Sequence, residues 1–126
     1  LEIITRYEID GIIISNTTNA NREKLLDIKK NEEGGLSGKP LKSISTEMIK
    51  KFYKESNKKI SIIGVGGVDS GQSAFEKIVS GASVVQLYTG MVYKGPSIVK
   101  EIKKELISIL NREGIKNIKE AVGIKA

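Results

Sequence analysis

The sequence predicts an α/β fold of alternating parallel strands and helices, the pattern of a (β/α)8 barrel. Three apolar runs at residues 12–14, 61–65 and 83–87 have the composition of strands, and a segment with helical spacing follows each of them along the chain. The runs are apolar at nearly every position, as in strands that are covered on both faces. A polar or glycine-rich segment comes directly after each run, where such barrels carry their ligand-binding loops.

The first residues predict a helix that is already under way. Leu1, Ile4 and Glu8 lie at helical spacing, and neither a methionine nor a capping residue precedes them. We therefore expect a helix that ends between Glu8 and Gly11, in a chain whose front part is missing.

A polar cluster, residues 15–18, follows the first predicted strand. The hydroxyl and carboxamide groups of Ser15, Asn16 and Thr17 offer donors and acceptors to a planar polar ligand. A loop whose Asn and Thr side chains bond to their own backbone explains the cluster about as well.

The segment from residue 19 to 33 is polar and irregular, which predicts a surface excursion. Three glycines then fall within residues 34–38, which favours close approach of the backbone to a bound cofactor. Ser45 or Thr46 is placed to cap the next helix, whose buried stripe is expected to be Met48, Ile49, Phe52 and Tyr53.

Residues 60–90 predict a strand, a glycine turn, a helix and a second strand. Ser70 can cap this helix, Gly81 can end it, and its apolar face is expected to hold Ala74, Phe75, Ile78 and Val79. Two strands joined through a helix should run parallel.

Gly66 and Gly67 lie at the carboxyl end of the first of these strands and predict a phosphate site. Their N–H groups, with those of the helix that begins near Ser70, are expected to face one anion. Barrel phosphate sites use the loops after the last two strands, and Tyr88-Thr89-Gly90 follows the next strand here. A tight turn without a ligand explains the glycine pair alone equally well, and the second loop favours a ligand.

The last predicted elements are a long helix and a short turn. Residues 91–96 lead into the helix, Gly114 ends it, and its apolar stripe is Val99, Ile102, Leu106, Ile109 and Leu110. A closing turn is expected over residues 118–122. Three parallel strands would leave two bare edges, and an eight-stranded barrel needs about 200–250 residues. The sequence therefore predicts the last three βα units of such a barrel.

The composition narrows the possible functions. The chain of 126 residues is 39% hydrophobic and 29% charged, which is typical of a globular domain. It has neither cysteine nor histidine, so we expect no metal site built from them and no histidine base. Its net charge of +6 comes from dispersed lysine pairs without interleaved aromatic residues, so nucleic-acid binding is not expected. No apolar run approaches the roughly twenty residues that span a bilayer.

Four motifs together resemble the class 2, quinone-dependent dihydroorotate dehydrogenases. They are DGIIISNTT at residues 10–18, GGLSGKPL at 34–41, IIGVGGV at 62–68 and GASVVQLYT at 81–89, with EAVG at 120–123 near the end. The resemblance covers nearly all of the chain and corresponds to the carboxyl-terminal third of such an enzyme. It implies that residues 1–126 are the carboxyl-terminal part of an FMN-binding (β/α)8 barrel that oxidises dihydroorotate to orotate in pyrimidine synthesis.

The resemblance also implies roles for individual residues. Asn16 and Thr17 would bind the substrate, and Leu41 would lie close to the flavin. Contacts to FMN would come from Ser15, Ser37, Gly38, Gly66, Gly67, Tyr88 and Thr89, the last four at its phosphate. A weaker correspondence places Met91, Val92 and Pro96 at the border of the quinone tunnel.

The family's catalytic serine, and the amino-terminal helices that form its membrane-facing quinone entrance, match nothing in this sequence. The resemblance therefore implies that the catalytic base and the rest of the barrel come from residues before Leu1, and that the chain is inactive alone. It implies membrane association, at the mitochondrial inner membrane or a bacterial cytoplasmic membrane. The alternatives are another phosphate-binding barrel enzyme, such as a different flavin oxidoreductase or a sugar-phosphate enzyme, and a basic nucleic-acid-binding domain.

Overall fold

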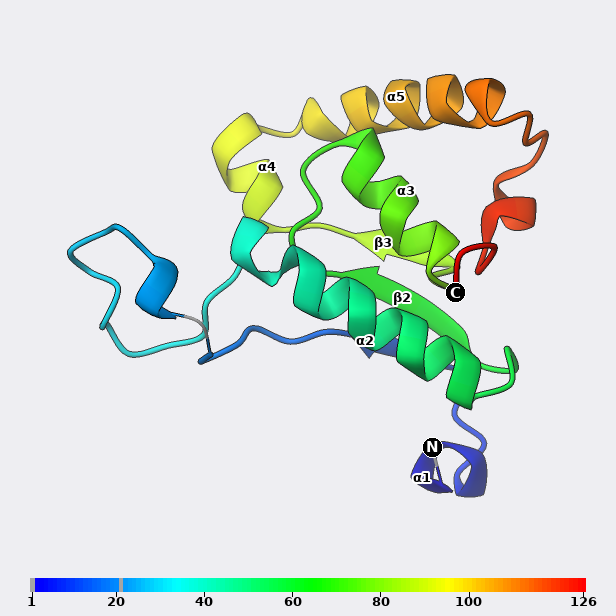
Figure 1. Cartoon of the computed structure of the whole chain (residues 1–126), viewed down its shortest axis with the longest axis horizontal. Coiled ribbons are helices and arrows are strands. Elements are labelled where there is room, and N and C mark those ends of the chain that lie inside the picture. The colour runs from blue at the N-terminus through cyan, green and yellow to red at the C-terminus, as the bar shows by residue number, and fades with distance from the viewer. Residues whose placement is uncertain (1, 21) are drawn as a thin grey trace.

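The computed structural model describes residues 2–20 and 22–126 as a parallel sheet with helices on one face (Figure 1). The strands β1 (Gly11–Ile14), β2 (Ser61–Val65) and β3 (Val84–Gln86) lie in this order in the sheet. Both neighbouring pairs are parallel. The predicted α/β class and the parallel strand–helix–strand unit are thus confirmed, with strand bounds within one residue of those predicted.

In the ranges that the structure describes, five helices and three 3-10 turns connect and cover the strands. The helices are α1 (Glu2–Arg6), α2 (Lys42–Glu55), α3 (Gly71–Val79), α4 (Thr89–Lys94) and α5 (Ile98–Arg112). The 3-10 turns are Arg22–Lys24, Lys39–Leu41 and Ile118–Ala121. None of the helices in the described ranges is both long and apolar enough to cross a membrane.

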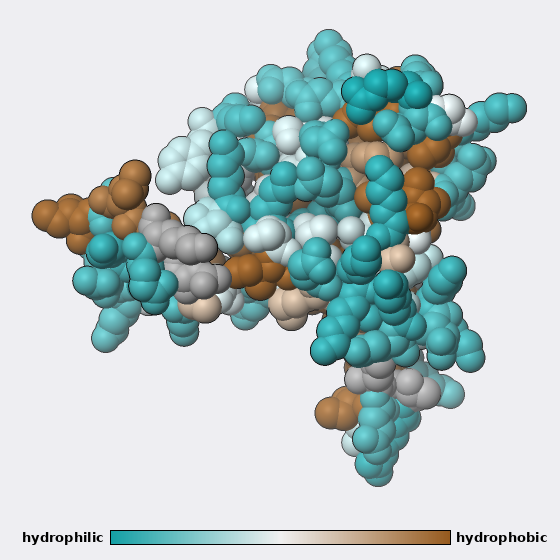
Figure 2. Space-filling model, in the orientation of Figure 1, coloured by the Kyte–Doolittle hydropathy of each residue, from teal (hydrophilic) through white to brown (hydrophobic). Residues whose placement is uncertain are grey.

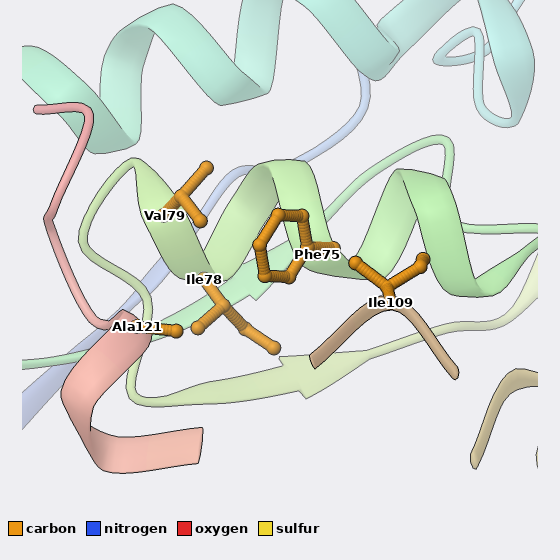
Figure 3. Packing of buried hydrophobic residues seen from close by; sticks show 5 residues of the cluster. All are labelled: Phe75, Ile78, Val79, Ile109 and Ala121. Atoms are coloured by element: carbon orange, nitrogen blue, oxygen red, sulfur yellow. The ribbon is translucent and has the colours of Figure 1, made fainter. Parts of the chain in front are cut away.

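Apolar side chains join the helices to one face of the sheet. Ile14 and Ile62 pack with Ile49 of α2, and Val68 and Ala74 pack with Ile98 and Ile102. A third cluster joins α3, α5 and the last turn, and Figure 3 shows its five side chains, Phe75, Ile78, Val79, Ile109 and Ala121. Most of the predicted apolar stripes of α3 and α5 are therefore buried, and Ser70 caps α3 in a capping box with Ser73, as expected.

The other face of the sheet is open in this chain, which differs from the prediction that the strands are covered on both faces. Ile13, Ile63 and Val84 are paired across the three strands, so their side chains form one row on this face. Ile13 and Val84 are each 56% exposed, because the helices that the structure describes cover only the opposite face. Within the described residues, β1 and β3 also pair along one edge only. An open apolar face and two free edges are the features expected of a segment of a closed barrel.

Several predicted helix ends are wrong. The first helix ends at Arg6, because Tyr7 and Glu8 form a turn with a positive φ at Glu8, and Leu1 lies outside the described residues. Helix α2 begins at Lys42, before both predicted caps, because the 3-10 turn at Lys39–Leu41 with its proline leads directly into it.

Two further local predictions fail. Met48 is half exposed and does not belong to the buried stripe of α2. The segment expected only to lead into the last helix forms the separate short helix α4.

The predicted surface excursion is confirmed and projects from the body of the molecule (Figure 1). A bridge between Thr18 and Leu36 closes its base, with N–H to carbonyl distances of 3.1 and 2.7 Å. The Arg22 guanidinium donates to the carbonyls of Lys30, Glu32 and Gly34 and so holds the loop together. Figure 2 shows a mostly hydrophilic surface with a hydrophobic tip on this excursion, where Leu26 and Ile28 are exposed.

Candidate functional site

The loops that follow β1, β2 and β3 meet at one end of the sheet around a cavity of ≈ 850 Å³. Its lining includes every residue that the resemblance assigned to substrate or flavin: Ser15, Asn16, Thr17, Ser37, Gly38, Leu41, Gly66, Gly67, Tyr88 and Thr89. Parallel strands place all their carboxyl ends at the same edge, so loops far apart in sequence converge there.

The other three predicted residues lie outside this cavity. Met91 and Val92 are exposed on α4, and Pro96 is exposed just after it. Beyond Thr89 and Gly90 at its start, the residues of this helix that line the cavity are Tyr93 and Lys94, which the sequence analysis did not single out.

The loop after β1 presents polar groups to the cavity. The Ser15 N–H donates to the Val65 carbonyl at 3.2 Å, which ties the loop to β2. The Asn16 side-chain oxygen accepts from the Thr17 N–H at 2.8 Å. The alternative of a loop that bonds its own backbone is thus partly correct, yet the amide nitrogen of Asn16 donates to no group in residues 2–20 and 22–126.

The glycine-rich segment 34–38 forms a wall of the cavity between the first and third loops. A side chain at Gly35 would overlap Thr17, and one at Gly38 would come within 3.0 Å of the Thr89 methyl group. The Thr89 hydroxyl donates to the Ser37 hydroxyl at 2.9 Å. These contacts explain why the chain needs glycine at both positions, as the sequence suggested.

The Gly66–Gly67 turn also lines the cavity. The prediction that the first N–H groups of α3 contribute to an anion site there is wrong. The Gly71 N–H donates to the Glu105 carboxylate, and the Ser73 N–H donates to the Ser70 hydroxyl. The amino-terminal N–H groups of α3 are therefore largely occupied by the chain itself.

The unoccupied donors at the cavity belong to two loops. The N–H groups of Gly66 and Gly67 donate to no group within the described ranges, and the same holds for Thr89 and Gly90 at the start of α4. Two adjacent pairs of free N–H groups can surround a phosphate without the help of α3.

Charged groups at the rim of the cavity were missed by the sequence analysis. Lys39 lies 3.6 Å from the Asp69 carboxylate, and the Lys94 ammonium donates to the Asp69 carbonyl at 2.8 Å. Their positions depend on contacts between loops that are distant in the sequence, so no local pattern could reveal them.

A buried lysine stands behind the Gly66–Gly67 turn. Lys77 of α3 has no exposed surface, and burial lowers its pKa from 10.5 to about 8. The negative charge of Glu76 opposes this shift in pKa, and the positive charge of Lys42 adds to it. Its spacing of three residues from Ala74 places it on a buried side of the helix, a signal that was available in the sequence.

Comparison with known proteins reveals the family of the chain. Residues 1–110 match the family model described as dihydroorotate dehydrogenase. The chain belongs to the dihydroorotate dehydrogenase family. It is 44% identical over 124 residues to the dihydroorotate dehydrogenase (quinone) of Natronomonas pharaonis, covering 98% of this chain and 35% of that protein. The mitochondrial dihydroorotate dehydrogenase (quinone) of Mus musculus is 47% identical over 92% of this chain and 29% of its own length.

The fold of the chain matches a solved dihydroorotate dehydrogenase. The ligand-free enzyme of Eimeria tenella superimposes with a TM-score of 0.95 and 41% identity, over 98% of this chain and 34% of the solved chain. The chain thus spans about a third of the length of the relatives that it matches. The family resemblance and the (β/α)8 class are confirmed, and the alternatives of a sugar-phosphate enzyme and a nucleic-acid-binding domain are set aside.

Proposed function

We propose that this chain supplies the last three βα units of an FMN-dependent barrel enzyme that oxidises dihydroorotate to orotate, with quinone as the electron acceptor, in pyrimidine synthesis. The observation that carries the proposal is the convergence of the four family motifs on a single cavity at the carboxyl ends of the strands. Below, the completed enzyme means this chain joined to the front part of the barrel that its relatives contain.

The residues at the cavity fit the phosphate of FMN. The free N–H groups of Gly66, Gly67, Thr89 and Gly90 would donate to its oxygens, and the Thr89 hydroxyl would add a further bond by donating to the phosphate in place of the Ser37 hydroxyl. Ser15, Ser37 and Gly38, which line the cavity, would contact the ring system, and Tyr88 would lie beside the phosphate. When bound, FMN supplies the acceptor for the hydride that leaves the substrate.

The share of this chain in the reaction is orientation of the substrate. Asn16 and Thr17 would hold the dihydroorotate ring by hydrogen bonds, which fixes the distance over which the hydride moves. The base that removes the ring proton would come from the front part of the barrel, so we assign no catalytic residue to this chain.

Quinone and a membrane surface are the further partners that we propose. Met91, Val92 and Pro96 would border the quinone channel from the outer side of α4, where all three are exposed. The relatives from Mus musculus and Arabidopsis thaliana are named as mitochondrial. We propose peripheral association with the mitochondrial inner membrane or a bacterial cytoplasmic membrane, and no role in nucleic-acid binding.

The visible spectrum of the purified completed enzyme tests this proposal. We expect the absorption bands of a bound flavin, which should bleach on addition of dihydroorotate and return on addition of quinone. A completed enzyme that folds but purifies without flavin, and cannot be loaded with FMN, would contradict the proposal. A flavin that another reductant bleaches but dihydroorotate does not would contradict the substrate assignment alone.

Asn16→Ala should weaken orotate binding and turnover while the FMN content is unchanged. The loss of one or two hydrogen bonds to a charged ligand should weaken binding by about tenfold to a hundredfold. Orotate titration and flavin quantification of the same sample measure both quantities. Asn111→Ala, at an exposed position of α5, is the matched control and should change neither. Loss of flavin at unchanged orotate affinity would show that Asn16 serves the cofactor instead.

A further inference from the structure

Lys77 forms a complete set of hydrogen bonds beneath the surface of the protein. Its ammonium group donates to the Lys42 carbonyl at 2.9 Å and to the hydroxyls of Ser45 and Thr46 at 2.6 Å each. Three donors therefore meet three acceptors, all in the first turns of α2. Burial of a charged group is costly unless it is fully bonded, so this arrangement indicates a specific role for the ammonium group.

One of these acceptors connects the lysine to the Gly66–Gly67 turn. The Ser45 hydroxyl accepts from Lys77 and donates to the Gly66 carbonyl at 3.1 Å. The Lys42 carbonyl of the same helix is a further acceptor for both hydroxyls, at 2.7 Å from Thr46 and at 3.2 Å from Ser45, so the Gly66 carbonyl is the nearer acceptor of Ser45. Of the two hydroxyls that Lys77 contacts, Ser45 alone bonds to the glycine turn.

The geometry of the peptide unit links the bond at the Gly66 carbonyl to the orientation of the Gly67 N–H. The Gly66 carbonyl and the Gly67 N–H belong to the same trans peptide unit and point in opposite directions. Because Ser45 holds the carbonyl toward the interior, the Gly67 N–H is held toward the cavity that Gly67 lines. A positive charge at the start of such a chain of hydrogen bonds strengthens each later donor.

The two charged side chains near Lys77 compensate each other, so the Lys77 ammonium is the charge that polarises the Ser45 hydroxyl and the Gly66–Gly67 peptide unit. Lys42 and Glu76 are the charged groups that act on Lys77. They form an ion pair at 2.8 Å with each other and so largely compensate one another.

From this geometry we infer that Lys77 is a positioning residue for the cofactor phosphate, which acts through Ser45 to aim and polarise the Gly67 N–H. The inference rests on the proposed function, since it assumes that the anion at this turn is the FMN phosphate. We call the hydrogen bonds from Lys77 to Ser45 and from Ser45 to the Gly66 carbonyl the relay. A variant that breaks the relay should bind the phosphate more weakly and the flavin ring as before.

The test compares FMN with riboflavin, which has the same ring system and no phosphate, on the flavin-free completed enzyme. Ser45→Ala should weaken FMN binding by about tenfold, the usual effect of one bond to a charged group, and riboflavin binding by less than about twofold. Thr46→Val is the matched control, because it removes one hydroxyl acceptor of Lys77 without touching the glycine turn, and it should leave the FMN-to-riboflavin affinity ratio unchanged. If Ser45→Ala does not fold, Ser45→Cys, whose thiol is a weak donor, should show a smaller loss of the same kind.

The outcomes separate this inference from the proposed function. A wild-type protein that binds neither flavin contradicts the proposed function itself. FMN binding by the wild type, with equal losses of both flavins in the Ser45 variants, overturns the relay and leaves the proposed function intact. A loss specific for the phosphate that is equally large in Thr46→Val also overturns the relay, because the anchoring of Lys77 and not the bond to Gly66 would then govern the site.

Discussion

Replacement of Gly67 by alanine is expected to remove FMN from the completed enzyme and to destabilise its fold. Gly67 has a φ of +72°, and a Cβ there would lie 2.7 Å from the Cα and 2.8 Å from the backbone nitrogen of Lys42. These backbone atoms begin α2 and cannot move without shifting the helix. The strain of the positive φ and the overlap together should cost about 3 kcal/mol or more. The turn would have to move away from α2, which displaces its N–H groups from the phosphate.

A second glycine with a positive φ separates the two causes of destabilisation, the strain of the backbone and the overlap with α2. Gly114 has a nearly identical φ of +69°, but nothing lies within 4 Å of the Cβ that alanine would add. Gly114→Ala should therefore show only the conformational cost of about 1 kcal/mol and retain FMN. Urea unfolding and flavin quantification of both variants measure the two effects. Equal destabilisation by the two substitutions, or full retention of flavin by Gly67→Ala, would contradict the placement of the turn against α2.

The sequence was sufficient for the elements whose signals are local. The strand at residues 61–65 and the Ser70 cap followed from apolar runs and from a serine before a helical pattern, and both are confirmed. The start of α2 did not follow, since Ser45 and Thr46 resemble capping residues in every local respect. Their hydroxyls instead bond to Lys77, 32 and 31 residues further along the chain, and that partner becomes evident only after folding.

The candidate site shows the same division between local and distant signals. The residues that line the cavity could be named from motifs, because each motif directly follows a strand of a parallel sheet. The Gly66 and Gly67 donors were predicted, but the expected contribution of α3 was wrong, because the side chain of Glu105, on a different helix, already occupies the Gly71 N–H. The role of Lys77 was missed because a lysine in a helical pattern is normally solvated.

The open face of the sheet leads to the last prediction. Ile13→Asn in the completed enzyme should destabilise the fold by about 3 kcal/mol or more, although Ile13 is 56% exposed in this chain alone. The row of Ile13, Ile63 and Val84 crosses all three strands, and a closed barrel would bury it in its interior. The substitution would then remove buried apolar surface and leave an amide without partners. The midpoint of urea unfolding, together with the slope, measures the change in free energy.

Ile107 provides the matched control because it is 59% exposed on α5, nearly the same fraction as Ile13. It lies on a helix outside the sheet, where a barrel would leave it facing water. Ile107→Asn should therefore change the stability by no more than about 0.5 kcal/mol. Two isoleucines that are equally exposed in this chain would then differ several-fold in the unfolding free energy lost on substitution by asparagine. Only burial of the open face by the rest of the barrel accounts for such a difference. Equal small effects at both positions would mean that another arrangement leaves this face exposed, and the assignment of the chain to the end of a closed barrel would be wrong.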